Sequence, residues 1–594
     1  MIKSHLTRLP LFLTAICLVM AGVFVWRLVL VNALFGDPSG CGICLVQAAA
    51  LSDAPFLFTW VLLAWTGCAL GPTALGRLLR LASAALLAVY ATDVYVMGAF
   101  LTRLYVTWVL AIGATPAVVL EHLRSSGTAA PVALTVIACL TVVAVVHSPR
   151  PRQLRSAPVL VLLCLIVVSF SASSRYQVEY VHAWASQNVF LATQFSGISQ
   201  RYSQLHREQL QQASESIPDC RDGSRTGSDL IVLILESWSA YHSGLWGGTK
   251  NWTPELDAIA KQSLRTRRFV AGGFNTNDGL MAVIAGIPVL SPLTSLFARR
   301  SFEPAWGWDH TLPKQLKSGG YDTAFLTSGD LGFMNKGAWL EHVGFDYIEG
   351  HDHASYADVP RSHFKSAPDH LLFERATKYW ESHADMDQPL GLVIESVSSH
   401  TPFRHPISKE PGEEGVIRYL DSSVGDFFRG LENVGYFTTG GVLVIVSDHR
   451  SMTVIGEDER KAYGVWAPAL IPLIVHGNSI APTSTDQLAH QSDLAPSLAS
   501  LLTDRGCGFP GWNNVFEMPE ELRRHCAYHS SGTNWEQVLA YCEGGFGIVQ
   551  LKGDQSDFIT ADGLSPEVRK RILDEIAHWR VVTQLQTDQY LSSH

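Results

Sequence analysis

The sequence lacks an excess of positive charge. It carries 44 lysine and arginine residues against 54 aspartate and glutamate residues, which gives a formal net charge of −10. A nucleic-acid partner is therefore not expected, because binding to a phosphate backbone requires a basic surface. Internal repeats and low-complexity tracts are also missing, as are a P-loop, a dinucleotide-binding glycine fingerprint and a zincin helix. Common nucleotide-binding and zinc-protease motifs thus give no lead to function.

Charged residues are scarce, at 16% of the chain, whereas hydrophobic residues make up 47%. Nearly all long apolar runs fall before residue 175, and charges, histidine, glycine and proline are concentrated after it. A chain of 594 residues also exceeds what one ordinary core organises. The sequence predicts a membrane part followed by a water-soluble part.

Six apolar segments are long enough, or nearly so, for the ~20 residues that a bilayer requires. They lie near 10–34, 56–75, 79–100, 104–120, 130–147 and 156–173. If all six crossed, the basic cluster of Arg150, Arg152 and Arg155 would lie outside, against the positive-inside rule. If 104–120 instead rests on the outer interface, that cluster returns to the cytoplasm. We therefore expect a five-helix, multi-pass transmembrane domain over 1–175, with the later residues exported.

Asp93 and Arg103 flank the outer end of the third predicted span, and two interpretations of them stay open. They either snorkel to the interface or contact a lipid head group. Beyond the last span, 176–228 is predicted to form linking helices and a polar, breaker-rich linker.

Six of the ten cysteines fall outside the cytoplasm in this topology, and an even number there permits disulfides. They are Cys41, Cys44, Cys220, Cys507, Cys526 and Cys542. Cys526–Cys542 is the first pairing we expect. A zinc site at 41–44 is disfavoured, because a second pair of ligands is absent.

From 229 to 594 short apolar runs alternate with helix-like stretches, which predicts an α/β domain with a largely parallel, buried sheet. Polar groups follow the predicted strands. Glu236 comes directly after IVLIL, Asp448 and His449 after VLVIVS, His400 five residues after LGLVIE, and Lys336 eight after TAFLTS. Ligands of open α/β sheets bind beyond the carboxyl ends of the strands. These side chains are therefore expected to face one site.

A carboxylate at the end of a buried strand is costly unless a cation or hydrogen bonds compensate its charge. Glu236, Asp448 and His449 offer two oxygen ligands and one nitrogen ligand, which suits Zn²⁺ or Mn²⁺ better than Ca²⁺. The alternative is a polar loop and a helix-capping acid. Thr276 precedes a helix-like run after a small-residue loop, and it is either a helix N-cap or a metal-activated nucleophile.

Five stretches resemble, in this order, the lipoteichoic acid synthase type of membrane sulfatase-like proteins in the alkaline phosphatase superfamily. They are LILESWSAYHSGLWGGTKNWTPELDAIA, GGFNTNDGLMAVIAGIP, SGDLGFMNKGAWLEHVGFDYI, SSHTPF and IVSDH. The family includes phosphoglycerol and phosphoethanolamine transferases. The resemblance covers roughly 230–500 strongly and the membrane part less specifically, and it implies an alkaline phosphatase/sulfatase-like fold for the soluble domain.

The resemblance implies one divalent metal, Mn²⁺ or Zn²⁺, held by four residues. These are Glu236, Thr276, Asp448 and His449. Thr276 would be the nucleophile that takes the head group from a membrane phospholipid such as phosphatidylglycerol, giving a phospho-threonine intermediate. His400 would contact the phosphate or protonate the leaving group. The expected acceptor is an extracytoplasmic glycan or glycolipid.

Phe333, Asn335 and Lys336 fall where the family binds glycerol phosphate, although the family pattern is Phe-Trp-Asn-Arg, so the identity of the head group is open. Arg450 stands where the family has glycine, and it faces either a substrate or solvent. His490 and Asp493 are expected to cap a helix. The formylglycine signature of true sulfatases is absent around Thr276, which disfavours sulfate ester hydrolysis.

Three alternatives to phosphoglycerol transfer remain at this stage. The first is phosphoethanolamine transfer to lipid A or a glycan. The second is a membrane-tethered phosphodiesterase that releases head groups to water. The third is a non-catalytic relative, against which the joint presence of all four metal-ligand residues argues.

Overall fold

The computed structural model describes most of the chain and forms two compact units, Met1–Ser196 and Gly197–His594, which we treat separately. The described residues are 11–35, 42–100, 103–104, 156–175, 183–190, 208, 218–290, 302, 306–401, 403–453, 455–516, 525–531, 537–552 and 555–593. The interfacial helix expected near 104–120 and the span expected at 130–147 lie outside these residues, except for Leu104.

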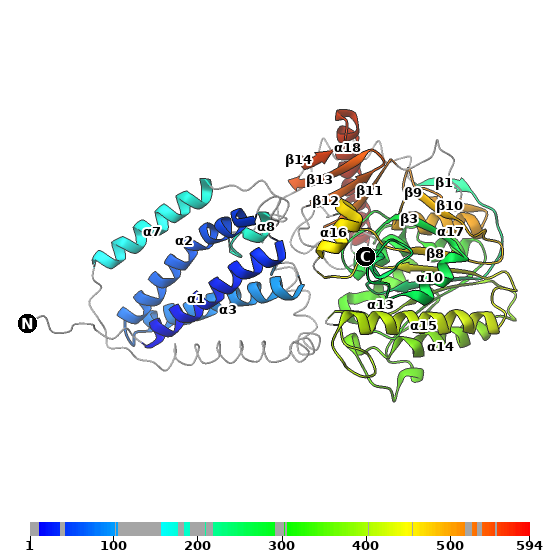
Figure 1. Cartoon of the computed structure of the whole chain (residues 1–594), viewed down its shortest axis with the longest axis horizontal. Coiled ribbons are helices and arrows are strands. Elements are labelled where there is room, and N and C mark those ends of the chain that lie inside the picture. The colour runs from blue at the N-terminus through cyan, green and yellow to red at the C-terminus, as the bar shows by residue number, and fades with distance from the viewer. Residues whose placement is uncertain are drawn as a thin grey trace, which may run out of the picture. The chain divides into compact units, whose positions relative to one another are not determined.

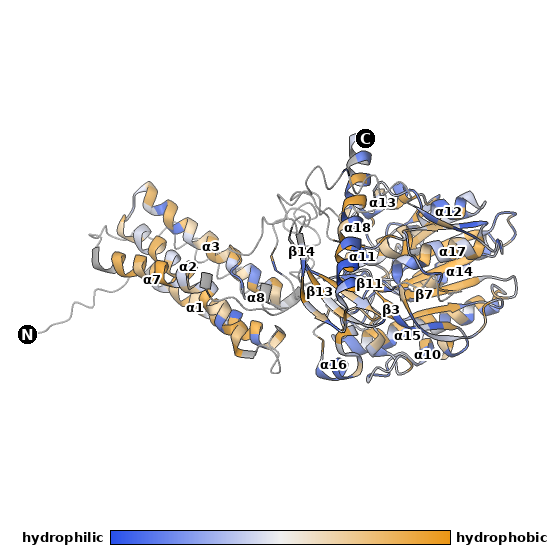
Figure 2. Ribbon diagram, turned by 90° about the horizontal axis from the view of Figure 1, so that it is seen from above, coloured by the Kyte–Doolittle hydropathy of each residue, from blue (hydrophilic) through white to orange (hydrophobic). Residues whose placement is uncertain are grey.

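The membrane unit contains three described helices that are long and apolar enough to cross a bilayer, so the described residues do not establish five spans. They are α1 (Leu11–Phe35), α2 (Gly42–Ala69) and α3 (Ala74–Phe100). A fourth helix, α7 (Ser156–Arg175), has a shorter apolar part. These three candidate spans and the fourth helix are rich in hydrophobic residues (Figure 2).

The second span begins earlier than the predicted 56–75. Asp53 and Pro55 interrupt the apolar run of the sequence, yet both lie inside α2. The Asp53 carboxylate is buried and bonded to Arg27 of α1, with Nε–Oδ2 at 2.9 Å, and it also accepts a bond from the Tyr90 hydroxyl at 2.7 Å. A charge that looked incompatible with a span is thus compensated within the helix bundle.

Asp93 and Arg103 form a second buried ion pair, with Nη2–Oδ2 at 2.7 Å. Arg103 is 2% exposed, and its Nη1 also donates to the Gln187 carbonyl at 2.6 Å. The pair therefore points into the unit and does not snorkel, which corrects that interpretation. It ties α3 to the segment that follows α8 (Ala183–Ser186).

The soluble unit is built on an eight-stranded sheet of order β5-β4-β6-β2-β7-β8-β3-β9. The strands are β2 (Leu230–Leu235), β3 (Leu264–Val270), β4 (Asp322–Thr327), β5 (Tyr347–Glu349), β6 (Leu390–Glu395), β7 (Val442–Ser447), β8 (Leu473–His476) and β9 (Ser484–His490). All pairings are parallel except those of β8 with β7 and β3. The predicted mostly parallel sheet is confirmed.

The central strands are almost purely aliphatic because helices cover both faces of the sheet. Along β2, Val232 and Ile234 enter one buried cluster, while Ile231 and Leu233 enter the other. The first cluster also holds residues of α12 (Leu312–Ser318), α13 (Lys336–Val343) and α17 (Leu494–Leu502). The second holds residues of α10 (Pro254–Lys261), α14 (Asp369–Glu381) and α15 (Glu413–Asn433), of which α14 and α15 lie side by side (Figure 1).

Two disulfides join pairs of strands outside the main sheet of this unit. Cys526 and Cys542 join β11 (Cys526–Ser530) to β12 (Gln537–Cys542), as expected. Cys220 and Cys507 join β1 (Asp219–Asp222) to β10 (Arg505–Gly508), so the predicted linker 216–228 contains a strand. Because β1 reads DCRD, it has no apolar alternation by which the sequence would reveal it.

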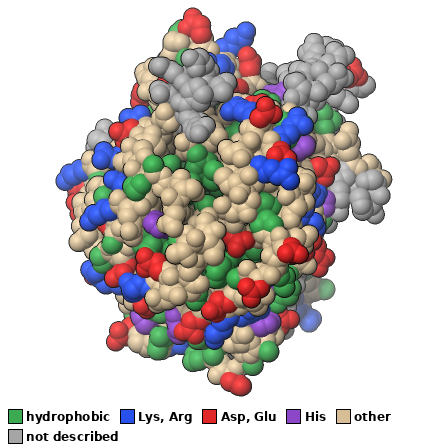
Figure 3. Space-filling view, turned by 90° about the vertical axis from the view of Figure 1, so that its right-hand side faces the viewer, with side chains coloured by type: hydrophobic (Ala, Val, Ile, Leu, Met, Phe, Trp, Pro, Cys, Tyr) green, Lys and Arg blue, Asp and Glu red, His purple; other side chains and the backbone are tan. Residues whose placement is uncertain are grey.

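The last part of the chain forms a four-stranded antiparallel sheet, β11 to β14, followed by α18 (Pro566–Ser593). Strands β13 (Gly545–Lys552) and β14 (Gln555–Asp562) complete this sheet. Its strand β11 contacts the segment that follows β3 of the main sheet, since the Ser530 N–H donates to the Gly272 carbonyl at 2.9 Å. One face of the soluble unit shows charges of both signs with scattered hydrophobic groups (Figure 3), as expected of a surface in water.

Candidate active site

The candidate metal ligands converge because β2 and β7 are adjacent, parallel and in register. Leu235 pairs with Ser447, so Glu236 and Asp448 leave the same edge of the sheet together. His449 follows directly. The ligand atoms of Glu236, Asp448 and His449 all lie within 4.8 Å of one another, and all three residues are buried.

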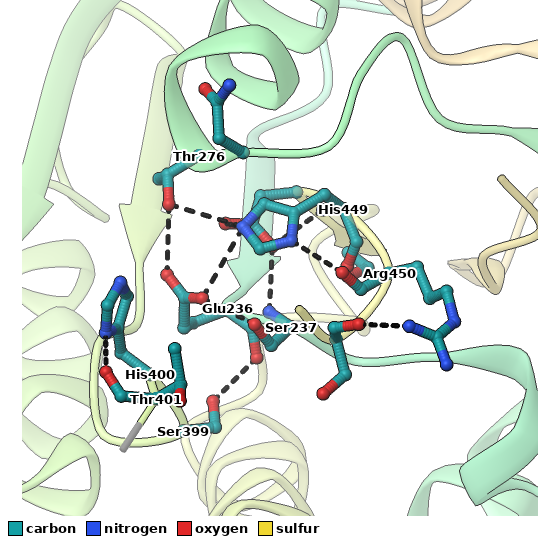
Figure 4. Close-up of polar contacts among 12 residues, drawn as sticks. Glu236, Ser237, Thr276, Ser399, His400, Thr401, His449 and Arg450 are labelled. Carbon is teal, nitrogen blue, oxygen red and sulfur yellow. Dashed lines mark hydrogen bonds and ion pairs between the residues drawn. The ribbon is translucent and has the colours of Figure 1, made fainter. Parts of the chain in front are cut away.

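Thr276 opens α11 (Thr276–Leu280) above this cluster. The helix N-cap is Asn275, whose side chain accepts a bond from the Asp278 N–H at 3.1 Å. Thr276 is therefore not the capping residue. Its hydroxyl lies 3.2 Å from Glu236 Oε2 and 3.4 Å from His449 Nε2 (Figure 4).

The donor atoms of this cluster fit a cation. His449 Nδ1 donates to the Arg450 carbonyl at 2.8 Å, which turns the Nε2 lone pair toward the carboxylates. Nε2 lies 3.2 Å from Asp448 Oδ2, and that buried oxygen has no hydrogen bond to any described group. Lone pairs that face one another in a buried pocket require a proton or a metal ion between them.

The pKa directions agree with this requirement. Burial, reinforced by the Asp448 charge, raises the pKa of Glu236 above its ordinary value. Burial alone would lower the pKa of His449, but the Asp448 carboxylate outweighs it and raises that pKa to about 9. Without a metal these shifts favour protonation of Glu236 and His449, and a divalent ion would take the place of these protons.

His400 lies beside Glu236 (Figure 4). Its Nδ1 donates to the Thr401 carbonyl, which leaves Nε2 with a free lone pair in the neutral ring. Burial lowers the pKa of His400 to about 4, although the Glu236 charge acts in the opposite sense. The imidazole is therefore neutral near pH 7 in the absence of a bound anion.

The predicted head-group residues divide into two sets. Phe333 and Asn335 are at least partly accessible, whereas Lys336 is buried and bonded to Glu395 at the end of β6, with Nζ–Oε1 at 2.5 Å. The charge of Lys336 is thus neutralised by Glu395. The resemblance instead implies a lysine whose free ammonium contacts the phosphate of the head group.

Arg450 points away from Thr276 (Figure 4). Its Nε and Nη2 bond both carboxylate oxygens of Glu459 at 2.7 and 2.5 Å, and the residue is 2% exposed. It is therefore not solvent-facing, which corrects that alternative. Its guanidinium is occupied in holding the loop after His449.

Several residues that support the site escaped prediction. Gln491 accepts from the Gly272 N–H at 2.7 Å and donates to the Ser447 and Asp448 carbonyls, each at 2.7 Å. Ser237 donates to Glu236 Oε1 at 2.6 Å, and its N–H donates to Asp448 Oδ1 at 2.8 Å. Neither residue type signals such a role in a sequence.

His490 and Asp493 do form the expected cap. The His490 side chain accepts from the Ser492 N–H at 3.1 Å, while Asp493 accepts from the His490 N–H at 2.9 Å. Their position next to Gln491 is the one signal that could have directed attention to it.

The soluble unit is thus an α/β domain with a mostly parallel sheet, and a threonine and a candidate metal-binding cluster lie at its strand ends. Residues 228–504, a little under half of the chain, match the family model Sulfatase. A solved structure of an alkaline phosphatase superfamily protein from Vibrio parahaemolyticus shares this fold. That structure has a TM-score of 0.52 at 19% identity, and the match covers 67% of this chain and 98% of that one.

The relatives agree with the family resemblance drawn from the motifs. Phosphoglycerol transferase I of Xanthomonas axonopodis pv. citri (strain 306) is 24% identical over 48% of this chain and 43% of its own. Lipoteichoic acid synthase 2 of Bacillus subtilis (strain 168) is 23% identical over 47% of this chain and 46% of its own. The chain spans less than half the length of these curated relatives.

Proposed function

We propose that the protein is a metal-dependent transferase that moves a phosphoglycerol head group from a membrane phospholipid, phosphatidylglycerol, to an extracytoplasmic glycan or glycolipid. The observation that carries the proposal is the Thr276 hydroxyl, 3.2 Å from Glu236 and 3.4 Å from His449, in a buried pocket whose donor atoms fit a divalent cation. The names of the relatives, phosphoglycerol transferase I and lipoteichoic acid synthase 2, support this choice of group.

Two displacements at phosphorus account for the transfer. In the first, Thr276 Oγ1 bonds to phosphorus and the bond from phosphorus to the diacylglycerol oxygen breaks, which leaves glycerol phosphate on Thr276. In the second, an acceptor hydroxyl attacks the same phosphorus and Thr276 leaves. His400, neutral before the reaction, contacts the phosphate and carries the protons: in the first step its Nε2 takes the Thr276 hydroxyl proton and gives it to the diacylglycerol oxygen, and in the second it takes the acceptor hydroxyl proton and gives it to Thr276 Oγ1.

Glu236, Thr276, Asp448 and His449 would hold one divalent ion, Mn²⁺ or Zn²⁺. When bound, it stabilises the deprotonated hydroxyl and the negative charge that builds on the phosphate oxygens. Around it, Ser237 and Gln491 orient the carboxylates and the strand ends. In this proposal the protein spans a bacterial cytoplasmic membrane several times with its soluble unit outside, where the two disulfides would persist.

Replacement of the nucleophile tests the proposal. Thr276→Ala should abolish both turnover of labelled phosphatidylglycerol and the labelled phosphoprotein, whereas Thr276→Ser keeps a hydroxyl and should retain part of both. Mass spectrometry locates the label on the peptide that contains residue 276. Undiminished activity of Thr276→Ala would remove Thr276 from this role. Free glycerol phosphate as the sole product would show a phosphodiesterase instead, and labelled ethanolamine phosphate transfer would change the donor.

A further inference from the structure

A wall of aromatic rings stands beside His400, and two of its three rings lie on a loop to which no motif pointed. The Phe364 ring lies 4.8 Å from the His400 ring, at an interplanar angle of 88°, and 4.7 Å from the Phe333 ring. His363 lies 6.0 Å from His400 between ring centres. All four side chains are half-buried, so each retains a face toward solvent. We call Phe333, His363 and Phe364 the aromatic wall.

The backbone holds Phe364 in a costly position. Phe364 and the following Lys365 have φ of 53° and 57°, a left-handed conformation that non-glycine residues seldom adopt. Arg361 offsets this cost, because its guanidinium bonds the carbonyls of Tyr356, His351 and Lys365 from below the loop. Strain that the surroundings hold in place is typical of ligand-binding loops.

The two loops that carry the wall are fastened to each other. Lys365 Nζ lies 2.8 Å from Asp330 Oδ2, and Asp330 also accepts the Gly332 N–H at 2.9 Å, just before Phe333. Phe333 and Phe364 therefore belong to one preorganised surface. His400 is the shared neighbour of this surface and of the Glu236 carboxylate.

Among the cations near the wall, Lys365 and Lys336 are paired with carboxylates, whereas Arg361 and Lys409 bond carbonyl and hydroxyl oxygens. Lys365 is bonded to Asp330, and Lys336, which follows the Phe333 loop, is bonded to Glu395. The wall itself presents aromatic faces and no ammonium or guanidinium group, and such a surface suits a neutral ring better than a phosphate. The apolar C–H face of a sugar ring fits such a surface, and its hydroxyls remain free to reach His363 and His400.

We propose that the aromatic wall is the acceptor subsite and that Phe364 is its platform for a pyranose ring. The inference rests on the proposed transferase function and names its acceptor class as a ring sugar. A hydroxyl of the ring stacked on Phe364 lies next to His400, which removes its proton as that hydroxyl attacks the phosphorus on Thr276. Phe364 is a specificity residue for the second displacement and takes no part in the first.

The test compares two neutral acceptors, cellobiose and sorbitol, with the full chain in detergent micelles and labelled phosphatidylglycerol as donor. Sorbitol offers hydroxyls without a ring. The wild type should transfer label to cellobiose about tenfold faster than to sorbitol at equal concentration, the scale of one aromatic contact. Phe364→Ala should bring the cellobiose rate down to the sorbitol rate, and Phe364→Trp should preserve the preference.

Phe558→Ala is the matched control, because it truncates a half-buried phenylalanine of β14 and should leave the preference intact. In Phe364→Ala, formation of the labelled phosphoprotein and the KM for phosphatidylglycerol should stay at wild-type values, which also reports a folded protein. A raised KM for the donor, or equal use of the two acceptors by the wild type, would overturn the inference. Absence of the phosphoprotein from the wild type would instead refute the proposed function.

Discussion

At the residue scale, the candidate site depends on side chains that bind no ligand themselves. The amide of Gln491 bonds two different segments. Its oxygen accepts from the Gly272 N–H before α11, and its nitrogen donates to the Ser447 and Asp448 carbonyls at the end of β7. One segment leads to Thr276 and the other carries Asp448 and His449. The distance between the proposed nucleophile and the proposed metal ligands is thereby fixed by one buried amide.

Gln491→Met should therefore weaken metal binding more than its effect on stability explains. It keeps the volume of the side chain but removes three hydrogen bonds, so we expect about tenfold weaker Mn²⁺ affinity, the effect typical of a lost outer partner. Titration of the metal-free protein with Mn²⁺ by calorimetry measures this affinity.

Gln315→Met is the matched control. Gln315 is also buried and also makes three hydrogen bonds to backbone groups, with the Cys507 N–H and the carbonyls of His310 and Cys507. Both variants should lose similar stability, and only Gln491→Met should lose metal affinity. Equal Mn²⁺ affinities in the two variants would show that Gln491 is structural alone.

At the scale of elements, the sequence predicts the strands that have a local apolar pattern. It does not predict the strands that are defined by their pairing with distant segments. Strands β2, β4, β6 and β7 could be predicted from their apolar runs, because a strand that is covered on both faces needs a continuous apolar run. The polar ends of these strands predict the site for the same reason. By contrast, β3 (LRTRRFV) and β9 (STDQLAH) carry charged residues near the sheet edge, and no alternation reveals them.

The same distinction applies within the site. Glu236, Asp448 and His449 could be predicted as site residues, because a charged group directly after a buried strand is rare and costly. Gln491 and Phe364 act through contacts with segments far away in the sequence, and neither carries an unusual charge. Arg450 could be singled out as unusual, but its partner Glu459 lies nine residues further on, so its direction was not predictable.

The start of α15 provides a prediction about pH. Glu413 is the first residue of this helix, and one of its oxygens accepts bonds from Tyr241, His242 Nε2 at 3.2 Å and Ser451 at 2.7 Å. Burial alone would raise the pKa of Glu413, but these donors lower it from 4.5 to about 2. A lowered folded-state pKa stabilises the protein above pH 4.5, and this contribution disappears as the pH falls toward 2.

Glu413→Gln should remove that dependence. The wild type is expected to lose about 3 kcal/mol of unfolding free energy through this group between pH 6 and pH 2, and the variant should lose correspondingly less. Urea unfolding followed by tryptophan fluorescence at several pH values measures the difference. Glu414→Gln, at an exposed residue paired with Arg418, should behave like the wild type. Identical pH profiles for Glu413→Gln and the wild type would contradict the assignment.

At the scale of the whole molecule, the membrane unit is organised around buried charge instead of apolar packing alone. Arg27, Asp53, Asp93 and Arg103 come from three segments that lie far apart in the sequence, and all are at most 2% exposed. Three of them, Arg27, Asp53 and Arg103, bond residues 185–188, and Asp93 holds Arg103. Arg27 Nη2 bonds the carbonyls of Ala185, Ser186 and Gln187 at 3.3, 3.0 and 2.6 Å.

This bonding holds the segment that leads toward the soluble unit. For the proposed transfer from a membrane lipid, a fixed starting point of the connection between the two units would raise the effective concentration of the lipid at the site. Asn188 strengthens the attachment, since its Nδ2 bonds Asp53 Oδ1 at 2.6 Å and its N–H bonds the Ser52 hydroxyl at 2.7 Å.

Arg27→Met should consequently separate two activities that share one active site. The change leaves Asp53 buried without its cation, at a cost of about 3–5 kcal/mol to the membrane unit, and frees the carbonyls of 185–187. Turnover of phosphatidylglycerol in vesicles should fall severalfold, whereas cleavage of a soluble phosphodiester such as bis(4-nitrophenyl) phosphate should not change. The double variant Arg27→Met/Asp53→Leu removes the unpaired buried charge and should recover the stability of the unit. It should not recover the vesicle activity, because the bonds from Arg27 to the carbonyls of 185–187 are still missing. If vesicle activity returns with stability, the arginine serves only to fold the membrane unit, and the attachment of 185–187 has no part in delivering the lipid.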